Sequence, residues 1–326
     1  MVMSSVSFRC AETSKECEAA FELVCEIFNG ISCNGVDYKL KKLAWRYYGS
    51  VRPENIIIGL DQDKIVGVLR VCPVVMPWRD RDFRVAGLSS ICLAKEYQGQ
   101  GFGRVLMEKS VAYLDDQNYE FSFLVARKNV DYFYTKFGFF GASSYQSLKC
   151  QFEEENFEKK LAFGCFKIEN SAQYLEFFHS NYKQCFGAPR RGKGFWHYAI
   201  NRFPVMEFSF EEVIFEGDLI GYLVHRDREI IECGFSTDLP KSIIRQAIIE
   251  FSIPQLHLKL NVPHHHMITD SLTNDDVENN SRKCLFGGHM IRWPSKEKID
   301  KLDFSIGRPD QFKSPIFYNI PLLDEV

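Results

Sequence analysis

Apolar residues near the start of the chain recur at two different periods. Residues 14–28 place apolar side chains three and four positions apart, and residues 37–48 repeat this spacing, which predicts two amphipathic helices. Residues 55–71 instead hold two runs rich in β-branched residues on either side of a polar turn, which predicts a β-hairpin. A short strand is expected over residues 6–11. Strands and helices therefore mix within one unit.

The same mixture continues along the next part of the chain. We expect strands at 87–94 and 121–126, with a helix between them that ends near Asp116. A short helix over 129–137 and a strand at 138–143 follow. This order predicts an α/β fold, of the α+β kind, built on a mixed sheet.

The second half of the chain repeats landmarks of the first half in the same order, which predicts two copies of one fold. We place the first domain at 1–152 and the second at 160–326, because the stretch between them is charged and resembles a linker. The matched pairs are Phe8 with Phe166, Trp45 with Trp196, and Gly67 with Gly221.

Composition and charge narrow the class of protein. The chain has 326 residues, 45% of them hydrophobic, and a net charge of -3, so nothing attracts it as a whole to nucleic acid or to an anionic membrane. Its 11 cysteines are scattered singly, which is typical of reduced thiols. The sequence shows no signal peptide and no apolar run of membrane-spanning length. We therefore expect a cytoplasmic protein with no nucleic-acid or membrane partner.

Three glycines interrupt this pattern between the strand at 87–94 and the helix that follows it. Gly99, Gly101 and Gly103 stand on alternate positions, although glycine is a poor helix former. Glycines let backbone amides approach an anion closely, and a helix N-terminus attracts negative charge. The stretch therefore indicates a pyrophosphate cradle, and a plain tight turn is the alternative. Its spacing fits neither the dinucleotide fingerprint nor a Walker A loop.

Two motifs in the first half resemble a known family. Gln98, Gly101 and Gly103 after a strand resemble the acetyl-CoA loop of the GNAT N-acetyltransferase superfamily, whose pattern is Gln/Arg-x-x-Gly-x-Gly/Ala. Residues 134–139, YTKFGF, are similar to that family's Tyr-x-Lys-x-Gly-Phe ending. The resemblance covers roughly residues 6–149 and implies a GNAT fold there. The second half would then be a degenerate GNAT-like domain.

The resemblance also implies which residues hold the cofactor, acetyl-CoA. Backbone groups along the strand before the loop would pair with the pantetheine arm, and the loop amides would hold the pyrophosphate. The cofactor-binding residues implied in this way are Ile91, Cys92, Leu93, Gln98, Gly99, Gln100, Gly101, Phe102, Gly103, Arg104 and Asn129.

The reaction would be attack of a neutral amine on the acetyl thioester, with direct transfer. A phenol can protonate the departing thiolate, because their pKa values are similar. By its place in the motif Tyr134 would be this catalytic acid, and Tyr132 is the alternative.

No general base is assigned. The strand before the loop reads GLSSICLA and lacks the glutamate that many relatives carry there. Ser89 and Ser90 could order a water that relays the proton, and Asp80 and Asp82 are alternatives that a solvated turn explains better. Glu96 fits the non-catalytic pattern of the loop.

Three weaker signals receive ordinary interpretations. The run His264–His266 with Asp270 suggests zinc, but a surface loop explains it better and no metal is expected. The basic stretch 190–196 is interpreted as a solvated loop. Cys92 could be a nucleophile, although a small apolar neighbour of the thioester is favoured.

The sequence thus predicts an acetyl-CoA-dependent N-acyltransferase that acetylates a primary amine of a small molecule or protein. The second domain would shape the acceptor site without binding CoA, since Asp238 and Pro240 stand at the corresponding helix start. The alternatives are a non-catalytic CoA-binding or scaffold module, and an acyltransferase for longer acyl-CoA. The sequence names neither the acceptor nor the oligomeric state.

Overall fold

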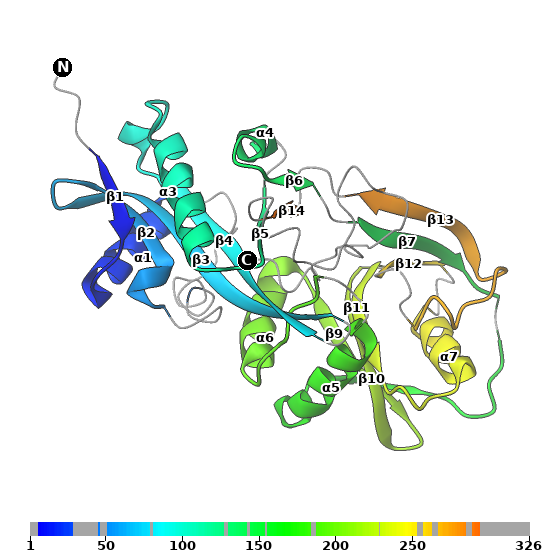
Figure 1. Cartoon of the computed structure of the whole chain (residues 1–326). Helices are drawn as coiled ribbons and strands as arrows, with labels where there is room; N and C mark the ends of the chain where they lie inside the picture. The colour runs from blue at the N-terminus through cyan, green and yellow to red at the C-terminus, as the bar shows by residue number, and fades with distance from the viewer. Residues whose placement is uncertain are drawn as a thin grey trace.

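The structure is a computed structural model, and its elements form two seven-stranded sheets with helices packed against them (Figure 1). The first sheet contains the N-terminal strands, and α5, α6 and α7 lie beside the second sheet. The residues that the structure describes are 6–28, 45, 51–78, 81–126, 130–141, 144–153, 155–183, 187–227, 229–252, 257–262, 267–284 and 289–293.

The first sheet is antiparallel except where β4 and β5 run parallel. Helix α1 (Ser14–Phe28) packs on one face and α3 (Phe102–Asp116) packs on the other. A short helix, α4 (Asp131–Thr135), comes before β6 in the chain, and β6 forms one edge of this sheet. The strands in spatial order are β1 (Ser7–Cys10), β2 (Ile56–Asp61), β3 (Lys64–Trp78), β4 (Arg81–Leu93), β5 (Phe121–Val125), β14 (His289–Arg292) and β6 (Phe140–Gly141).

Local sequence explains where α1 begins and which face it buries. The Thr13 hydroxyl accepts a hydrogen bond from the Glu16 N–H at 3.2 Å, and the Glu16 carboxylate accepts one from the Thr13 N–H at 3.3 Å. This reciprocal pair is a capping box, which satisfies two of the helix's unpaired donors. Ala20 and Phe21 then face the sheet, as the helical spacing predicts. The predicted helix at 37–48 lies outside the described residues except for Trp45, which is helical and buried.

The hairpin of β3 and β4 is longer than the sequence suggests. Pro73 and Pro77 argue against a strand, but pairing continues to Trp78 opposite Arg81. These prolines are tolerated because β2 stops pairing with β3 at Arg70, so the strand beyond it has an edge that needs no N–H donor. The long arm reaches the second half of the chain (Figure 1).

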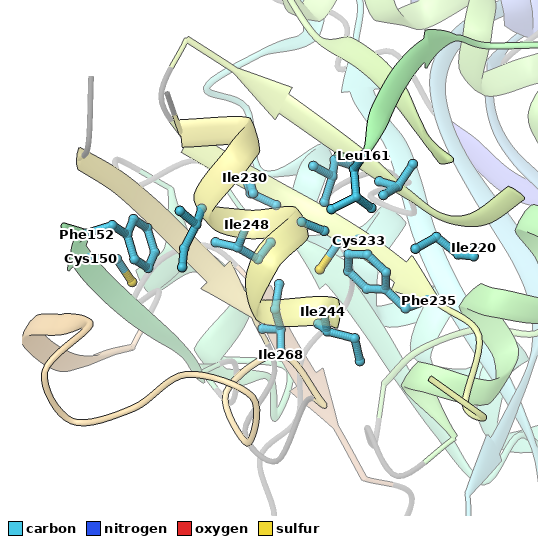
Figure 2. Close-up of a cluster of buried hydrophobic side chains, with 14 of the residues drawn as sticks. Cys150, Phe152, Leu161, Ile220, Ile230, Cys233, Phe235, Ile244, Ile248 and Ile268 are labelled. Carbon is cyan, nitrogen blue, oxygen red and sulfur yellow. The ribbon is translucent and has the colours of Figure 1, made fainter. Parts of the chain in front are cut away.

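The second sheet has the same order of antiparallel and parallel strand pairs as the first. Its one parallel pair is β11 with β12. Helix α7 (Lys241–Ser252) packs Ile244 and Ile248 onto it, against Cys233 and Phe235 (Figure 2). Two further helices are α5 (Ser171–Tyr182) and α6 (Phe195–Met206), and 3₁₀ turns lie at Pro53–Asn55 and Ile168–Asn170. The strands in spatial order are β8 (Ala162–Cys165), β9 (Ser209–Phe215), β10 (Asp218–Arg226), β11 (Glu229–Phe235), β12 (His257–Val262), β7 (Ser144–Gln151) and β13 (Val277–Cys284).

Each half contributes one strand to the sheet of the other half. Strand β14 belongs to the end of the chain, yet it lies between β5 and β6, where Met290 pairs with both Leu124 and Gly141. Strand β7 follows β6 directly, yet it lies between β12 and β13, with Leu148 opposite Leu260. Strand pairing therefore does not divide the chain at the predicted boundary of 152.

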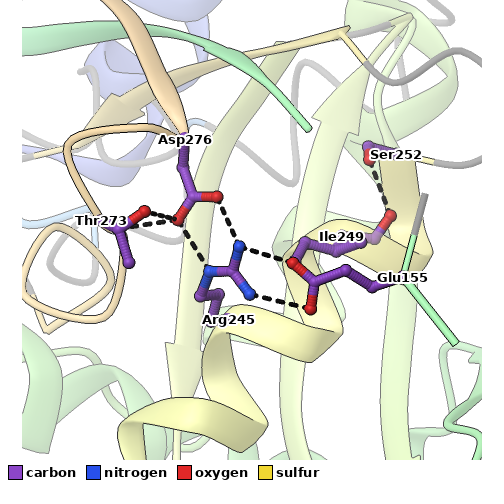
Figure 3. A network of polar contacts seen from close by, with 6 residues as sticks. All are labelled: Glu155, Arg245, Ile249, Ser252, Thr273 and Asp276. Carbon is purple, nitrogen blue, oxygen red and sulfur yellow. Dashed lines mark hydrogen bonds and ion pairs between the residues drawn. The ribbon is translucent and has the colours of Figure 1, made fainter. Parts of the chain in front are cut away.

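The charged stretch after β7 is held against the second half. Arg245 on α7 binds Glu155 with two hydrogen bonds of 2.8 and 3.1 Å and also binds Asp276 (Figure 3). Gln246 donates to the Lys159 carbonyl at 2.6 Å. These contacts order a segment whose composition suggests a free linker.

The basic stretch 190–196 is not a solvated loop either. The Arg191 side chain is 1% exposed, and its guanidinium binds Glu232 through two hydrogen bonds of 2.6 Å. Its neighbour Arg190 donates from its backbone to the Val75 carbonyl at 2.7 Å and from its side chain to Asp82 at 2.7 Å. A buried ion pair thus anchors the segment that holds the β3–β4 arm.

These shared strands predict how the first half behaves when it is isolated. A chain ended after residue 155 loses β14, so β5 and β6 lack the partner that satisfies their backbone groups. We expect residues 1–155 alone to give no cooperative unfolding transition by circular dichroism. Co-expression with residues 156–326 is the control and should restore a folded complex. A soluble, cooperatively unfolding 1–155 fragment would contradict the shared-strand arrangement.

Candidate active site

The parallel pairing of β4 with β5 stops well before β4 ends. Strand β4 pairs with β5 only from Val85 to Leu88. Ser90 then has a φ of 55°, and the register with β3 shifts there, so that Ser90 and Ile91 together oppose one residue of β3. This is a β-bulge, which bends a strand and re-aims its backbone. The rest of β4 therefore has β3 as a neighbour but no pairing with β5.

The bulge sets the direction of the backbone groups at the end of β4. Cys92 lies opposite Val68 of β3, and the Ala94 N–H donates to the Val66 carbonyl at 2.8 Å. Successive residues of a strand turn their backbone groups to opposite sides. Since Cys92 and Ala94 face β3, the backbone groups of Ile91 and Leu93 face away from it, on the side of the sheet where β5 pairs with the earlier part of β4. Backbone groups of these two residues are thus not used in pairing with β3.

Cys92 is unsuited to act as a nucleophile. Its side chain is buried in the cluster between α1 and the sheet, and burial raises the pKa of the thiol to about 12. A thiol with that pKa is protonated at neutral pH, whereas the thiolate is the nucleophile. The small apolar interpretation fits this environment.

The glycine loop leaves its backbone open to the surroundings. Gly99 has a φ of 74° and Gly101 a φ of 88°, in the region that favours glycine. A Cβ built at either residue meets no described atom within 4 Å. At Gly103 it would lie 3.7 Å from the Leu93 side chain and 3.8 Å from Phe133. The first two glycines are therefore required by conformation, and the space beside them is free.

Backbone donors gather where the loop enters α3. The N–H groups of residues 99–103 make no hydrogen bond to another described residue. The first turn of α3 contains no acidic side chain. Two members of the predicted set differ, because the Gln98 N–H donates to Lys95 at 3.3 Å and the Arg104 N–H donates to Gly101 at 3.0 Å. The available donors are thus those of Gly99 to Gly103.

Side chains of the loop itself bind nearby backbone carbonyls and so stabilise its shape. Gln98 donates to the Leu93 carbonyl at 2.8 Å, and Gln100 donates to the Glu96 carbonyl at 2.6 Å. Phe102 packs on Tyr97, with ring centroids 6.1 Å apart, in the 3₁₀ turn Lys95–Tyr97. Both glutamines therefore act through their side chains, which the motif alone does not reveal.

The loop is also tied to the β2–β3 hairpin. The Tyr97 hydroxyl donates to Asp61 at 2.7 Å, and Lys64 binds Glu96 at 2.8 Å. The Arg104 side chain is 75% exposed and pairs with Glu108 one turn further along α3. Glu96 thus has a structural ion pair, in agreement with its non-catalytic interpretation.

Tyr134 lies on α4, next to the end of β4. Its ring packs in the same cluster as Ile91 and Leu93, and it meets Phe133 edge-on at 5.3 Å. Phe133 in turn lies 3.8 Å from the position of a Cβ at Gly103. Tyr132, the alternative, is 64% exposed, with Lys136 over its ring. Of the two tyrosines, only Tyr134 is a member of the hydrophobic cluster that also contains Ile91 and Leu93, and its neighbour Phe133 lies close to Gly103.

The candidate bases are dispersed. Ser89 lies 3.6 Å from the Cys72 sulfur, and Ser90 forms the bulge. Asp82 pairs with Arg190, and Asp80 lies outside the described residues, as does the predicted contact Asn129. Within the described part of the chain, we therefore identify no carboxylate as a general base near the end of β4.

The second half has a different helix start at the corresponding place. Helix α7 begins at Lys241, directly after Pro240, whose carbonyl accepts the Ile243 N–H at 3.0 Å. Proline has no N–H, and Asp238 is exposed two residues before it. This helix start therefore lacks one N–H and has an acidic residue just before it in the chain, whereas residues 98–101 before α3 contain neither proline nor an acidic residue.

Two general features concern partners. Among the described residues no group of metal-ligating side chains comes together, and His264–His266 lie outside them. No helix in the described ranges is long and apolar enough to cross a bilayer.

Sequence analysis did not identify two residues that shape this region. Ser90 stands in an ordinary strand pattern, and only its positive φ marks the bulge. Arg292 lies in the sequence 177 residues after Asp115, yet it binds that carboxylate with two hydrogen bonds. No local pattern could have joined residues so far apart.

Comparisons with known proteins identify a known domain and a shared fold. A family model described as the acetyltransferase (GNAT) domain matches residues 11–141. A search of curated protein sequences finds no significant match.

Solved structures share the fold over most of the chain. A probable N-acyltransferase from Enterococcus faecalis has a TM-score of 0.68 at 14% identity, over 90% of this chain and 74% of that one. GCN5-related N-acetyltransferases from Kribbella flavida and Anabaena variabilis both have a TM-score of 0.62, at 14% and 15% identity. They cover 90% of this chain and 72% and 74% of their own. Residues 11–141 therefore match the GNAT acetyltransferase domain, and most of the chain shares its fold with these solved structures.

Proposed function

We propose that this protein transfers an acetyl group from acetyl-CoA to a primary amine. The observation that carries the proposal is the row of backbone donors from Gly99 to Gly103 at the start of α3, which make no hydrogen bond to any residue that the structure describes. A helix N-terminus carries about half a positive charge, and a diphosphate presents oxygens to several donors at once. Because Gly99 and Gly101 have no side chain, the diphosphate could approach their backbone N–H groups closely.

The separated end of β4 would hold the rest of the cofactor. Backbone groups of Ile91 and Leu93 face away from β3, so they are placed to hydrogen bond with the amide groups of the pantetheine arm. The Leu93 N–H is the more available group there, because the Leu93 carbonyl already accepts from Gln98. The acetyl thioester would then lie beyond Ile91, on the side of Tyr134.

The chemistry proceeds by direct transfer. The nitrogen lone pair of the neutral amine attacks the thioester carbonyl carbon, a C–N bond forms, and the C–S bond breaks. The Tyr134 O–H gives its proton to the departing sulfur, and the surplus proton of the amine passes to water, from which the phenolate is restored. The phenol suits this role because its pKa lies near that of a thiol.

The second half would present side chains to the acceptor. At the start of α7 it has Pro240, which has no N–H, and the acidic Asp238 just before it, so we propose one CoA per chain. It also holds the β3–β4 arm through Arg190, which contacts Val75 and Asp82. A degenerate GNAT-like domain in this place would complete the site without repeating its chemistry.

The direct test measures CoA release from acetyl-CoA with a panel of amines. The panel contains an amino sugar, an aminoglycoside, a polyamine, an amino acid and a peptide. We expect at least one to be acetylated faster than water attacks the thioester. CoA binding by calorimetry without release from any amine would favour a non-catalytic module. Faster release from a longer acyl-CoA would replace acetyl as the transferred group.

The glycine loop predicts a specific loss of binding. Gly101→Val places a branched side chain at a positive φ and blocks the approach of the diphosphate. We expect CoA affinity to fall by about tenfold or more, the value of at least one hydrogen bond to a charged group. Isothermal calorimetry measures both this affinity and the stoichiometry.

Gly217→Val is the matched control for that experiment. Gly217 has a φ of 93° and open space around it, but it lies in the turn between β9 and β10. Its substitution imposes similar strain and should leave CoA binding unchanged. Equal loss in both variants would show that strain, and not the cradle, sets the affinity.

Tyr134→Phe tests the proposed acid. The substitution keeps the ring that packs on Phe133 and removes the proton, so turnover should fall about 100-fold while CoA binding is kept. Steady-state rates with acetyl-CoA and the best amine of the panel give the comparison. Tyr132→Phe is the control, because that ring is mostly exposed. A loss confined to Tyr132→Phe would assign the role to the other tyrosine.

A further inference from the structure

Arg292 on β14 binds two elements of the first half at once. Its guanidinium makes two hydrogen bonds to the Asp115 carboxylate, of 2.8 and 3.0 Å, and its Nε donates to the Phe137 carbonyl at 3.2 Å. The side chain is 12% exposed. Its Cγ also lies 3.8 Å from the position of a Cβ at Gly138, so the stem packs against the turn. Arginine suits this place because its planar fork can bind a carboxylate with two groups and a carbonyl with the third.

The first of these elements is the helix that begins at the donor row. Asp115 lies in the last turn of α3. A carboxylate there faces the negative end of the helix dipole, which costs free energy unless a cation is close. Arg292 supplies that cation and fixes the far end of α3 to β14.

The second element is the turn that ends the Tyr134 helix. The Tyr134 carbonyl accepts the Phe137 N–H at 3.0 Å and the Phe139 N–H at 3.3 Å. Gly138 has a φ of 82°, which closes this turn. The Phe137 carbonyl that Arg292 binds is therefore part of the same hydrogen-bonded turn that fixes the Tyr134 backbone.

α3 and α4 are thus joined at two places. Near the donor row, Phe133 packs close to Gly103. At the other end, Arg292 bridges Asp115 and Phe137. Two separated contacts define the orientation of one helix against another, whereas a single contact leaves a rotation free. Without Arg292, the contact of Phe133 near Gly103 and the hydrophobic cluster would remain, but the bridge from Asp115 to Phe137 would be lost.

We propose that Arg292 is a positioning residue, through which the end of the chain sets Tyr134 against the thioester. The inference rests on the proposed function, since it concerns the acid of that reaction. It adds that the last described strand controls the chemical step and leaves cofactor binding to the glycine loop. Small displacements of a catalytic group cost large factors in rate, so a loosened α4 should affect kcat above all.

The test compares three variants of the full chain with acetyl-CoA and the best amine of the panel. Arg292→Gln should lower kcat by about 10- to 100-fold, with KM for acetyl-CoA and CoA affinity kept. Arg292→Lys keeps the charge opposite Asp115 but not the fork, so we expect kcat to fall there as well. Adding Arg292→Gln to Tyr134→Phe should lower kcat no further, because the residue acts through Tyr134.

The control is Arg245→Gln in the second half. Arg245 also binds an aspartate with two hydrogen bonds and a second acceptor, Glu155, but it lies on α7 (Figure 3). Its loss should lower stability and leave kcat unchanged. A drop in kcat equal to that of Arg292→Gln would overturn the inference, and so would a further loss in the Tyr134→Phe background.

Hydrogen exchange tests the positioning without any turnover. In Arg292→Gln the amides of residues 137 and 139 should exchange about tenfold faster than in Arg245→Gln, while those of 99–103 stay unchanged, because opening of the turn is local. Unchanged exchange would overturn the inference even if kcat falls. If the unmodified chain acetylates no amine of the panel, the proposed function fails, and this exchange measurement still decides whether Arg292 orders α4.

Discussion

The structure depends on one constraint, that the backbone groups of every sheet strand need a partner. In the first sheet, β5 and β6 are not neighbours, and β14 from the end of the chain fills the place between them. In the second, β7 fills the same place between β12 and β13. Since each half completes the other, the two sheets are expected to form together. The candidate site therefore belongs to the whole chain, although its motif is local.

The same pairing rule identifies the backbone groups of β4 that the sheet leaves open. Pairing with β5 ends at Leu88, and beyond the bulge at Ser90 the backbone groups of Ile91 and Leu93 that face away from β3 have no strand partner among the described residues. The glycine loop then offers a second set of donors without side chains in the way. Backbone groups that are usually consumed by secondary structure are thus available in two adjoining places. Tyr134, from a third element, belongs to the same hydrophobic cluster as Ile91 and Leu93.

The two halves show how one strand order supports different roles. Both sheets contain a parallel pair at the same place in their order, β4 with β5 and β11 with β12. The helix that follows begins with glycines in the first half and with Pro240 in the second. The second half instead buries Arg191 against Glu232 and holds the β3–β4 arm through Arg190. The difference lies at one helix start, where the first half has glycines and the second half has a proline and an acidic residue.

The sequence by itself determined what local physics controls. Helical spacing gave α1 over residues 14–28, and glycine chemistry located the loop at 99–103, because both depend on neighbours within a few positions. Tertiary structure decided the length of the β3–β4 arm, the burial of Arg191 and the place of β14. It also joined Arg292 to Asp115. These features depend on contacts between residues far apart in the chain, and periodicity carries no information on which distant strand or carboxylate a segment will meet.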